Sequence, residues 1–153
     1  MTALRGGIAI GQLSVEGAGE GSDWLRWERD GRVPRSVPTD FATHVEEHFA
    51  RLAENGIEAC RFTLDWARVV PRTGRPDGDE MEHLEAVVEA ATAAGIGLWL
   101  GLHDVSLPGW FLDEGGFADD RARGRFWPAD VVGVAERVGD RVAGWFPLIS
   151  PVT

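Results

Sequence analysis

The sequence lacks lysine and tyrosine, and it has a single cysteine, Cys60, among its 153 residues. One cysteine excludes an internal disulfide and suits a reducing compartment, so we expect a cytoplasmic protein. Apolar runs are short, and none approaches the roughly 20 residues that span a bilayer. The amino-terminal stretch has no clear cleavage site, so we expect neither a membrane segment nor a signal peptide.

Positive charge is also scarce. All 15 basic residues are arginine, against 25 acidic residues, and the formal net charge is −10 at pH 7. Binding to nucleic acid needs clustered basic residues that displace counterions from phosphates, so this balance argues against it. Tryptophan is abundant, with seven residues. Because tryptophan stacks on sugars and also fills protein cores, the count favours neither use.

Strand and helix patterns alternate along the chain. Alternating or continuous apolar residues predict strands over 5–15, 58–66, 96–102 and 142–149. Helical spacing predicts helices over 39–55, 79–94 and 128–139. The apolar run 96–102 predicts a strand covered on both faces, and 106–125 is expected to be a long loop.

This order indicates parallel βαβ units within one domain, residues 1–153. Two α/β architectures suit it: a small doubly wound sheet, or half of an eight-stranded βα barrel. No glycine-rich nucleotide fingerprint follows a strand, and we expect no cofactor.

Polar residues gather where the predicted strands end, which is where a βα barrel places its site. They are Ser14, Glu16, Asp65, His103, Asp104 and Ser150. Arg61 lies within a predicted strand and has two interpretations. It pairs with Asp65 and only fixes structure, or it points into a polar site at the barrel mouth.

Several stretches carry a resemblance to a known family. Residues 22–28 read S-D-W-L-R-W-E, 61–71 read R-F-T-L-D-W-A-R-V-V-P, 102–111 read L-H-D-V-S-L-P-G-W-F, and 145–151 read W-F-P-L-I-S-P. In this order they resemble motifs from the N-terminal half of glycoside hydrolase family 1, the β-glucosidase and β-galactosidase family. The resemblance implies a partial (β/α)8 TIM barrel, roughly its first four βα units, and a β-glycoside or sugar ligand.

The resemblance also implies substrate-binding candidates. They are Ser14, Glu16, Arg61, His103, Asp104 and Trp110. Other tryptophans, Trp24 and Trp66, are candidates for lining a sugar cleft, although core packing is as good an interpretation for Trp66.

The sequence departs from the family's motifs at the positions that bind the sugar and carry out catalysis. The family's sugar-binding Gln and His are replaced by Ser14 and Asp104, and its Asn and acid/base Glu by Ile149 and Ser150. The family's nucleophile comes from a later strand, which these residues do not reach. Retaining glycosidases need two carboxyl groups about 5–5.5 Å apart, so we expect no catalytic residue and no hydrolysis by the family mechanism.

Two alternatives use other carboxylates. Asp104 and Glu16 both end predicted strands and could form a rebuilt two-carboxylate site. His103 beside Asp104 suggests a metal site, but adjacent strand residues point to opposite faces, so we expect none there.

A third pattern, Asp40, His44 and His48, has the spacing of ligands on a helix. A solvated surface is the expected interpretation, and no metal is predicted.

Half a barrel leaves two open strand edges and an uncovered inner face. We therefore expect a homodimer or a complementing half-barrel as partner. The open alternatives are a non-catalytic sugar-binding or partner-binding module, and a truncated β-glycosidase gene product.

Overall fold

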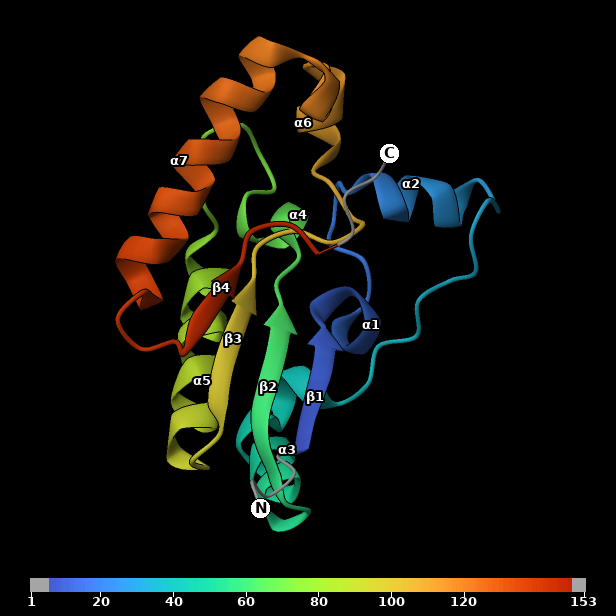
Figure 1. Cartoon of the computed structure of the whole chain (residues 1–153). Coiled ribbons are helices and arrows are strands. Elements are labelled where there is room, and N and C mark those ends of the chain that lie inside the picture. The colour runs from blue at the N-terminus through green and yellow to red at the C-terminus, as the bar shows by residue number, and fades with distance from the viewer. Residues whose placement is uncertain (1–5, 150–153) are drawn as a thin grey trace.

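The computed structural model describes residues 6–149, and its centre is a parallel sheet of four strands in the order β1-β2-β3-β4 (Figure 1). The strands are β1 (Gly6–Gly11), β2 (Ile57–Thr63), β3 (Gly97–Gly101) and β4 (Gly144–Phe146). Every neighbouring pair is parallel. This arrangement confirms the α/β prediction of a partial barrel.

Three long helices connect the strands: α3 (Val45–Glu54), α5 (Gly78–Ala93) and α7 (Asp120–Val138). In Figure 1, α3 and α5 lie behind the sheet, and α7 lies beside β4. Each predicted helix is therefore present, and α3 packs on α5, which packs on α7. No helix among residues 6–149 is long and apolar enough to cross a membrane.

Short helices occupy the end of the sheet where the strands finish (Figure 1). They are α1 (Gln12–Glu16), α2 (Asp23–Arg29), η1 (Phe41–Thr43), α4 (Trp66–Val69), α6 (Gly109–Asp113) and η2 (Gly116–Ala118). The strand predictions over 5–15 and 58–66 are thus too long, because each strand gives way to a short helix. The predicted loop 106–125 is wrong, since most of it is helical.

Helix α7 begins eight residues before the predicted start at Pro128. Asp119 caps it, because its carboxylate accepts hydrogen bonds from the N–H groups of Arg121 and Ala122 at 2.9 and 2.8 Å. Pro128 lies inside the helix, where it cannot supply one backbone hydrogen bond. The helix therefore begins after the capping residue Asp119 and not at Pro128.

The core lies between the sheet and the long helices. Phe49, Phe62, Val87 and Leu100 are almost fully buried there. A second group of aromatic rings, around the buried Trp66, holds the short helices on the ends of the strands. The large aromatic content is therefore used mostly in packing.

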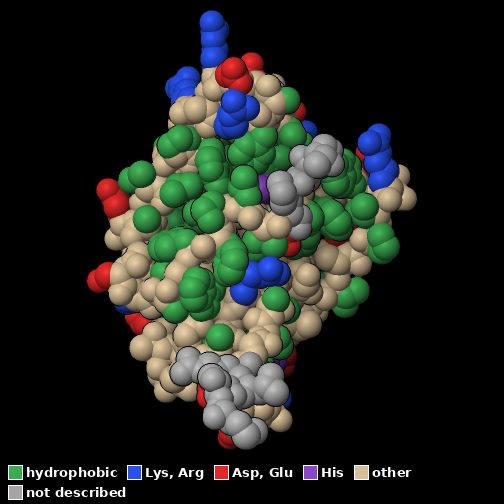
Figure 2. Space-filling view, viewed as in Figure 1, with side chains coloured by type: hydrophobic (Ala, Val, Ile, Leu, Met, Phe, Trp, Pro, Cys, Tyr) green, Lys and Arg blue, Asp and Glu red, His purple; other side chains and the backbone are tan. Residues whose placement is uncertain are grey.

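The opposite face of the sheet is open. Along β3, Leu98 and Leu100 are buried toward the helices, whereas Trp99 is 40% exposed. The prediction that this strand is covered on both faces is therefore wrong within residues 6–149. Ile8 and Phe146 are also exposed, at 38% and 41%, and hydrophobic side chains gather across this face in Figure 2. The continuous apolar run 96–102 therefore forms a strand with apolar side chains on both faces, of which one face is exposed in the described chain.

Candidate functional site

A small cavity lies at the carboxyl end of the sheet, between the ends of β1, β2 and β3. Its volume is about 60 Å³. The polar residues that line it are Gln12, Ser14, Thr63, Asp65, Asp104 and Ser106. Ser14 and Asp104, which are 90 positions apart and were both predicted as site residues, therefore share one cavity.

Three oxygen atoms that line the cavity are buried without a hydrogen-bond partner among residues 6–149. They are Thr63 Oγ1, Asp104 Oδ1 and Ser106 Oγ. Thr63 as a whole is only 3% exposed. A buried polar atom without a partner is costly, so such atoms in a cavity are expected to meet water or a ligand.

Asp65 also lines the cavity, but its carboxylate oxygens already accept hydrogen bonds from the protein backbone. It accepts hydrogen bonds from the N–H groups of Gly19 at 2.9 Å and Ala67 at 3.0 Å, and the latter contact begins helix α4. Burial raises the pKa of Asp65, and these two hydrogen bonds oppose the rise. No ion pair joins Asp65 to Arg61 in the described chain, so the interpretation of Arg61 and Asp65 as a pair is wrong.

Arg61 lies instead on the open face of the sheet. It is opposite Ala9 on β1 and Trp99 on β3, and with them it lines a shallow hollow. Its Nε is buried and finds no acceptor within residues 6–149. The other interpretation, that Arg61 points into a polar site at the barrel mouth, stays a prediction, because Arg61 does not line the cavity and the rest of its hollow is apolar or glycine.

Gln12, which also lines the cavity, joins helix α1, helix α5 and the segment after β2 in a polar network. Its amide N–H group donates to Glu16 at 2.9 Å and to Glu80 at 3.1 Å. Its carbonyl oxygen accepts from the backbone N–H of Asp65 at 2.8 Å. Since Gln12 is 3% exposed, these contacts fix the ends of β1 and β2 relative to helix α5.

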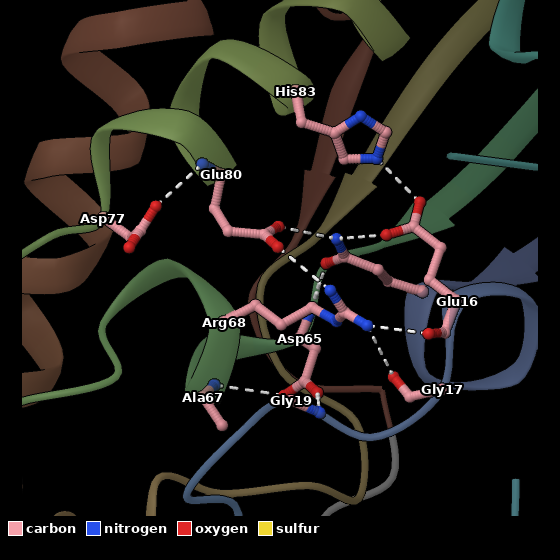
Figure 3. Close-up of polar contacts among 10 residues, drawn as sticks. Glu16, Gly17, Gly19, Asp65, Ala67, Arg68, Asp77, Glu80 and His83 are labelled. Atoms are coloured by element: carbon pink, nitrogen blue, oxygen red, sulfur yellow. Dashed lines mark hydrogen bonds and ion pairs between the residues drawn. The ribbon is translucent and has the colours of Figure 1, made fainter. Parts of the chain in front are cut away.

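Arg68 completes this network from helix α4 (Figure 3). Its guanidinium donates to Glu80 at 2.9 Å and to the backbone carbonyl oxygens of Glu16 and Gly17 at 2.7 and 3.2 Å. The backbone turn after α1 is therefore held by a charged side chain, not by a ladder of strand hydrogen bonds.

Glu16 faces this network and not the cavity. Its carboxylate accepts from Gln12 and lies 2.7 Å from His83 Nε2. The hydrogen bond with Glu16 raises the pKa of His83, and burial opposes the rise. The structure thus does not bring Glu16 and Asp104 together as a pair of facing carboxylates.

His103 and Asp104 follow β3 and do not lie within it, and their side chains have different surroundings: Asp104 lines the cavity, whereas His103 packs among aromatic rings. The His103 ring is 5% exposed and lies 5.3 Å from the Phe117 ring and 6.2 Å from the Trp127 ring, measured between centroids. Burial lowers the pKa of His103, so the neutral imidazole is favoured in this aromatic environment. His103 belongs to the core of the short helices.

Trp110 is likewise held in packing contacts. Its indole N–H donates to the carbonyl oxygen of Val70 at 2.8 Å, and its ring packs edge-on against Phe126 and Trp66. Of the other tryptophans, Trp66 is 1% exposed, and Trp24 packs against Trp27. None of the three lines the cavity.

No group of three or more metal-ligating side chains occurs within residues 6–149. His48 Nε2 does lie 3.0 Å from Asp40 Oδ1, but the Asp40 side chain is 66% exposed. The surface interpretation of Asp40, His44 and His48 fits this contact. Ser150, at the predicted acid/base position, lies outside the described residues.

The geometry can be compared with known proteins. The sequence profile of glycosyl hydrolase family 1 matches residues 23–152. The chain belongs to glycosyl hydrolase family 1. Beta-glucosidase A of Thermotoga maritima is 26% identical over 95% of this chain and 35% of its own length. A beta-glucosidase of an Agrobacterium species is 26% identical over 89% of this chain and 32% of its own.

Solved structures of the family agree in fold. Beta-glucosidase 1317 superposes with a TM-score of 0.86 at 23% identity, covering 95% of this chain and 37% of that one. The Thermotoga maritima beta-glucosidase in complex with deoxynojirimycin superposes with a TM-score of 0.85 at 24% identity, covering 96% and 36%. The chain therefore spans about one third of the length of these family 1 proteins.

Sequence reasoning missed the network of Gln12, Arg68, Glu80 and His83. Arg68 lies within the family 1 motif of residues 61–71, which is the one signal that singles it out. Glu80 and His83 are spaced as ordinary surface residues on a helix, and only the packing of α5 against the strand ends brings them inward.

Proposed function

We propose that this chain binds a β-glycoside or a related sugar at the carboxyl end of its sheet and does not hydrolyse it. The observation that carries the proposal is the cavity that Ser14 and Asp104 share. These residues stand at the positions where the family 1 resemblance puts sugar-binding side chains. The relatives named above are beta-glucosidases, which supports a sugar as the ligand.

The lack of hydrolysis follows from the residue at the acid/base position. A serine hydroxyl at Ser150 cannot protonate a leaving group near neutral pH, and general acid/base catalysis contributes typically about 10²- to 10⁴-fold. Glu16 does not replace it, because its carboxylate is taken by Gln12 and His83.

A second role, as one half of an assembled barrel, is favoured by the open sheet face. Ile8, Trp99 and Phe146 are exposed there, and an exposed apolar patch marks an interaction surface. In the described chain β1 and β4 are each paired on one side only, so both edges can extend the sheet. The partner in this proposal is a complementing half-barrel or a second copy of the chain.

A cytoplasmic location belongs to the same proposal. Burial raises the pKa of the Cys60 thiol to about 11, so the reactive thiolate is disfavoured. The residue acts as a small core side chain, as expected in a reducing compartment.

Two measurements on one preparation test the proposal. Chromogenic β-glucosides and β-galactosides report hydrolysis. Isothermal titration calorimetry with the corresponding methyl glycosides reports binding, because no tryptophan lines the cavity. We expect a saturable binding isotherm without turnover. Turnover that follows the protein through purification would overturn the absence of hydrolysis, and a flat titration would overturn sugar binding.

A further inference from the structure

The cavity at the carboxyl end of the sheet is lined by acidic side chains and by no basic ones. The lining side chains include two carboxylates, Asp65 and Asp104, and no arginine, lysine or histidine. Asp65 is satisfied by the N–H groups of Gly19 and Ala67. Asp104 Oδ1 is not, because it is buried with no hydrogen-bond partner in the described part of the chain.

A buried carboxylate oxygen needs a donor, and a cationic donor compensates it best. The nearby arginines do not supply one. Arg68 is engaged by Glu80 and by two backbone carbonyl oxygens. Arg61 lines the hollow on the open sheet face, which has a different set of residues. A cation at Asp104 must therefore come from outside residues 6–149.

The cavity also fits the number of donors that a primary ammonium group carries. An ammonium has three N–H donors and no acceptor. Three lining oxygen atoms that are buried without a partner in the described chain can accept: Asp104 Oδ1, Thr63 Oγ1 and Ser106 Oγ. Thr63 and Ser106 are 3% and 6% exposed, so the cavity holds two buried hydroxyl groups that a ligand or water can satisfy. A volume of about 60 Å³ admits a group of this size but not a sugar ring.

We infer that the cavity recognises a protonated primary amine carried by the sugar, so that this chain prefers amino sugars to neutral sugars. The inference rests on the proposed sugar-binding function and names the substrate class of the same site. The ring of the sugar remains at the open mouth of the cavity, and its amino group enters among Thr63, Asp104 and Ser106.

The test compares three classes of ligand that differ in one group. They are methyl β-D-glucoside, its amino-deoxy derivatives with the amine at C2, C3 or C6, and the N-acetyl forms of those amines. Binding is measured by calorimetry at about pH 6, below the ordinary pKa of an aliphatic amine. We expect at least one amino derivative to bind about ten-fold or more tightly than both its N-acetyl form and the neutral glucoside.

Two variants locate the effect. Asp104→Asn keeps the shape of the side chain and removes its charge, and we expect it to abolish the ratio of amine to N-acetyl affinity. Asp113→Asn removes the same charge from an exposed residue that pairs with Arg26, and it should leave that ratio unchanged. A circular dichroism melt of each variant verifies that it is folded.

The possible results distinguish the preference for amino sugars from sugar binding itself. Equal affinity for neutral and amino sugars would overturn the amine preference and leave sugar binding intact. A preference that survives Asp104→Asn would overturn the assignment to this cavity. Absence of binding for every compound of the three classes would overturn the proposed function, and the amine preference with it.

Discussion

The imidazole Nε2 of His83 lies 2.7 Å from Oε1 of Glu16, and this contact fastens the middle of the sequence to the first turn after β1. The Glu16 side chain is 2% exposed and that of His83 is 18% exposed. A pair so placed couples the stability of the fold to the protonation of His83. The charged groups that face His83 are Glu16 from α1, Glu80 from α5 and Arg68 from α4.

The pH dependence of this pair has a defined sign. The pKa of His83 is raised in the folded state, above an unfolded value of 6.5, by its hydrogen bond with Glu16. Its stabilisation is therefore fully present below pH 6.5 and is lost as the pH rises through the folded-state pKa.

We expect His83→Gln to lower the free energy of unfolding most below pH 6.5, with a smaller loss at higher pH. Urea unfolding at several pH values measures this, with His44→Gln as a control on an exposed histidine. A loss that is the same at every pH would contradict a protonated pair.

Asp130 on helix α7 provides a second titration. Burial raises the pKa of Asp130 to about 7 from 3.8, and the Trp66 indole partly offsets the rise. The folded state then favours the protonated acid, so stability is greatest below the unfolded value and falls as the pH rises through about 7.

Asp130→Asn removes this penalty, and we expect it to raise stability at pH 8 by up to about 4 kcal/mol relative to wild type. Thermal unfolding across the pH range measures it. Glu136→Gln, on an exposed part of the same helix, should have little effect. A destabilised Asp130→Asn at pH 8 would show that the carboxylate is ionised and well bound there.

The polar network around Gln12 contributes to stability through Arg68. Removing the Arg68 guanidinium breaks the ion pair with Glu80 and leaves the backbone carbonyl oxygens of Glu16 and Gly17 without this donor. We expect Arg68→Ala to cost about 2–4 kcal/mol in denaturant unfolding.

A matched control is Arg137→Ala. Arg137 lies 2.8 Å from Glu85, but its side chain is 46% exposed, so the expected cost is about 1 kcal/mol or less. Equal costs for the two variants would mean that burial adds nothing to the Arg68 network.

The open sheet face predicts self-association. Sedimentation of the purified chain should give a species larger than a monomer, and Trp99→Asp should shift it toward the monomer. Val37→Asp is the control, because Val37 is 79% exposed and is not among the residues that line the hollow on this face. A sharp, cooperatively melting wild-type monomer would contradict a role for the face in assembly between copies.

The sequence by itself determined the order of strands and helices and the family resemblance. Apolar periodicity and glycine stops are local signals, and the strands and long helices follow them. The resemblance placed Ser14 and Asp104 at one site because motifs keep their order along the chain. Short helices such as α4 and α6 were missed, since a few turns held by capping and aromatic packing have no periodic pattern of their own.

The tertiary structure decided how each polar residue is used. Glu16, Asp65 and Asp104 look alike in sequence, as acids that follow strands. In the folded chain the Glu16 carboxylate contacts His83 and Gln12, and the Asp65 carboxylate accepts from two backbone N–H groups. Asp104 Oδ1 has no hydrogen-bond partner in the described chain. The physical reason is that the free energy of a buried charge depends on partners far apart in sequence, and only the fold brings those partners within hydrogen-bond distance.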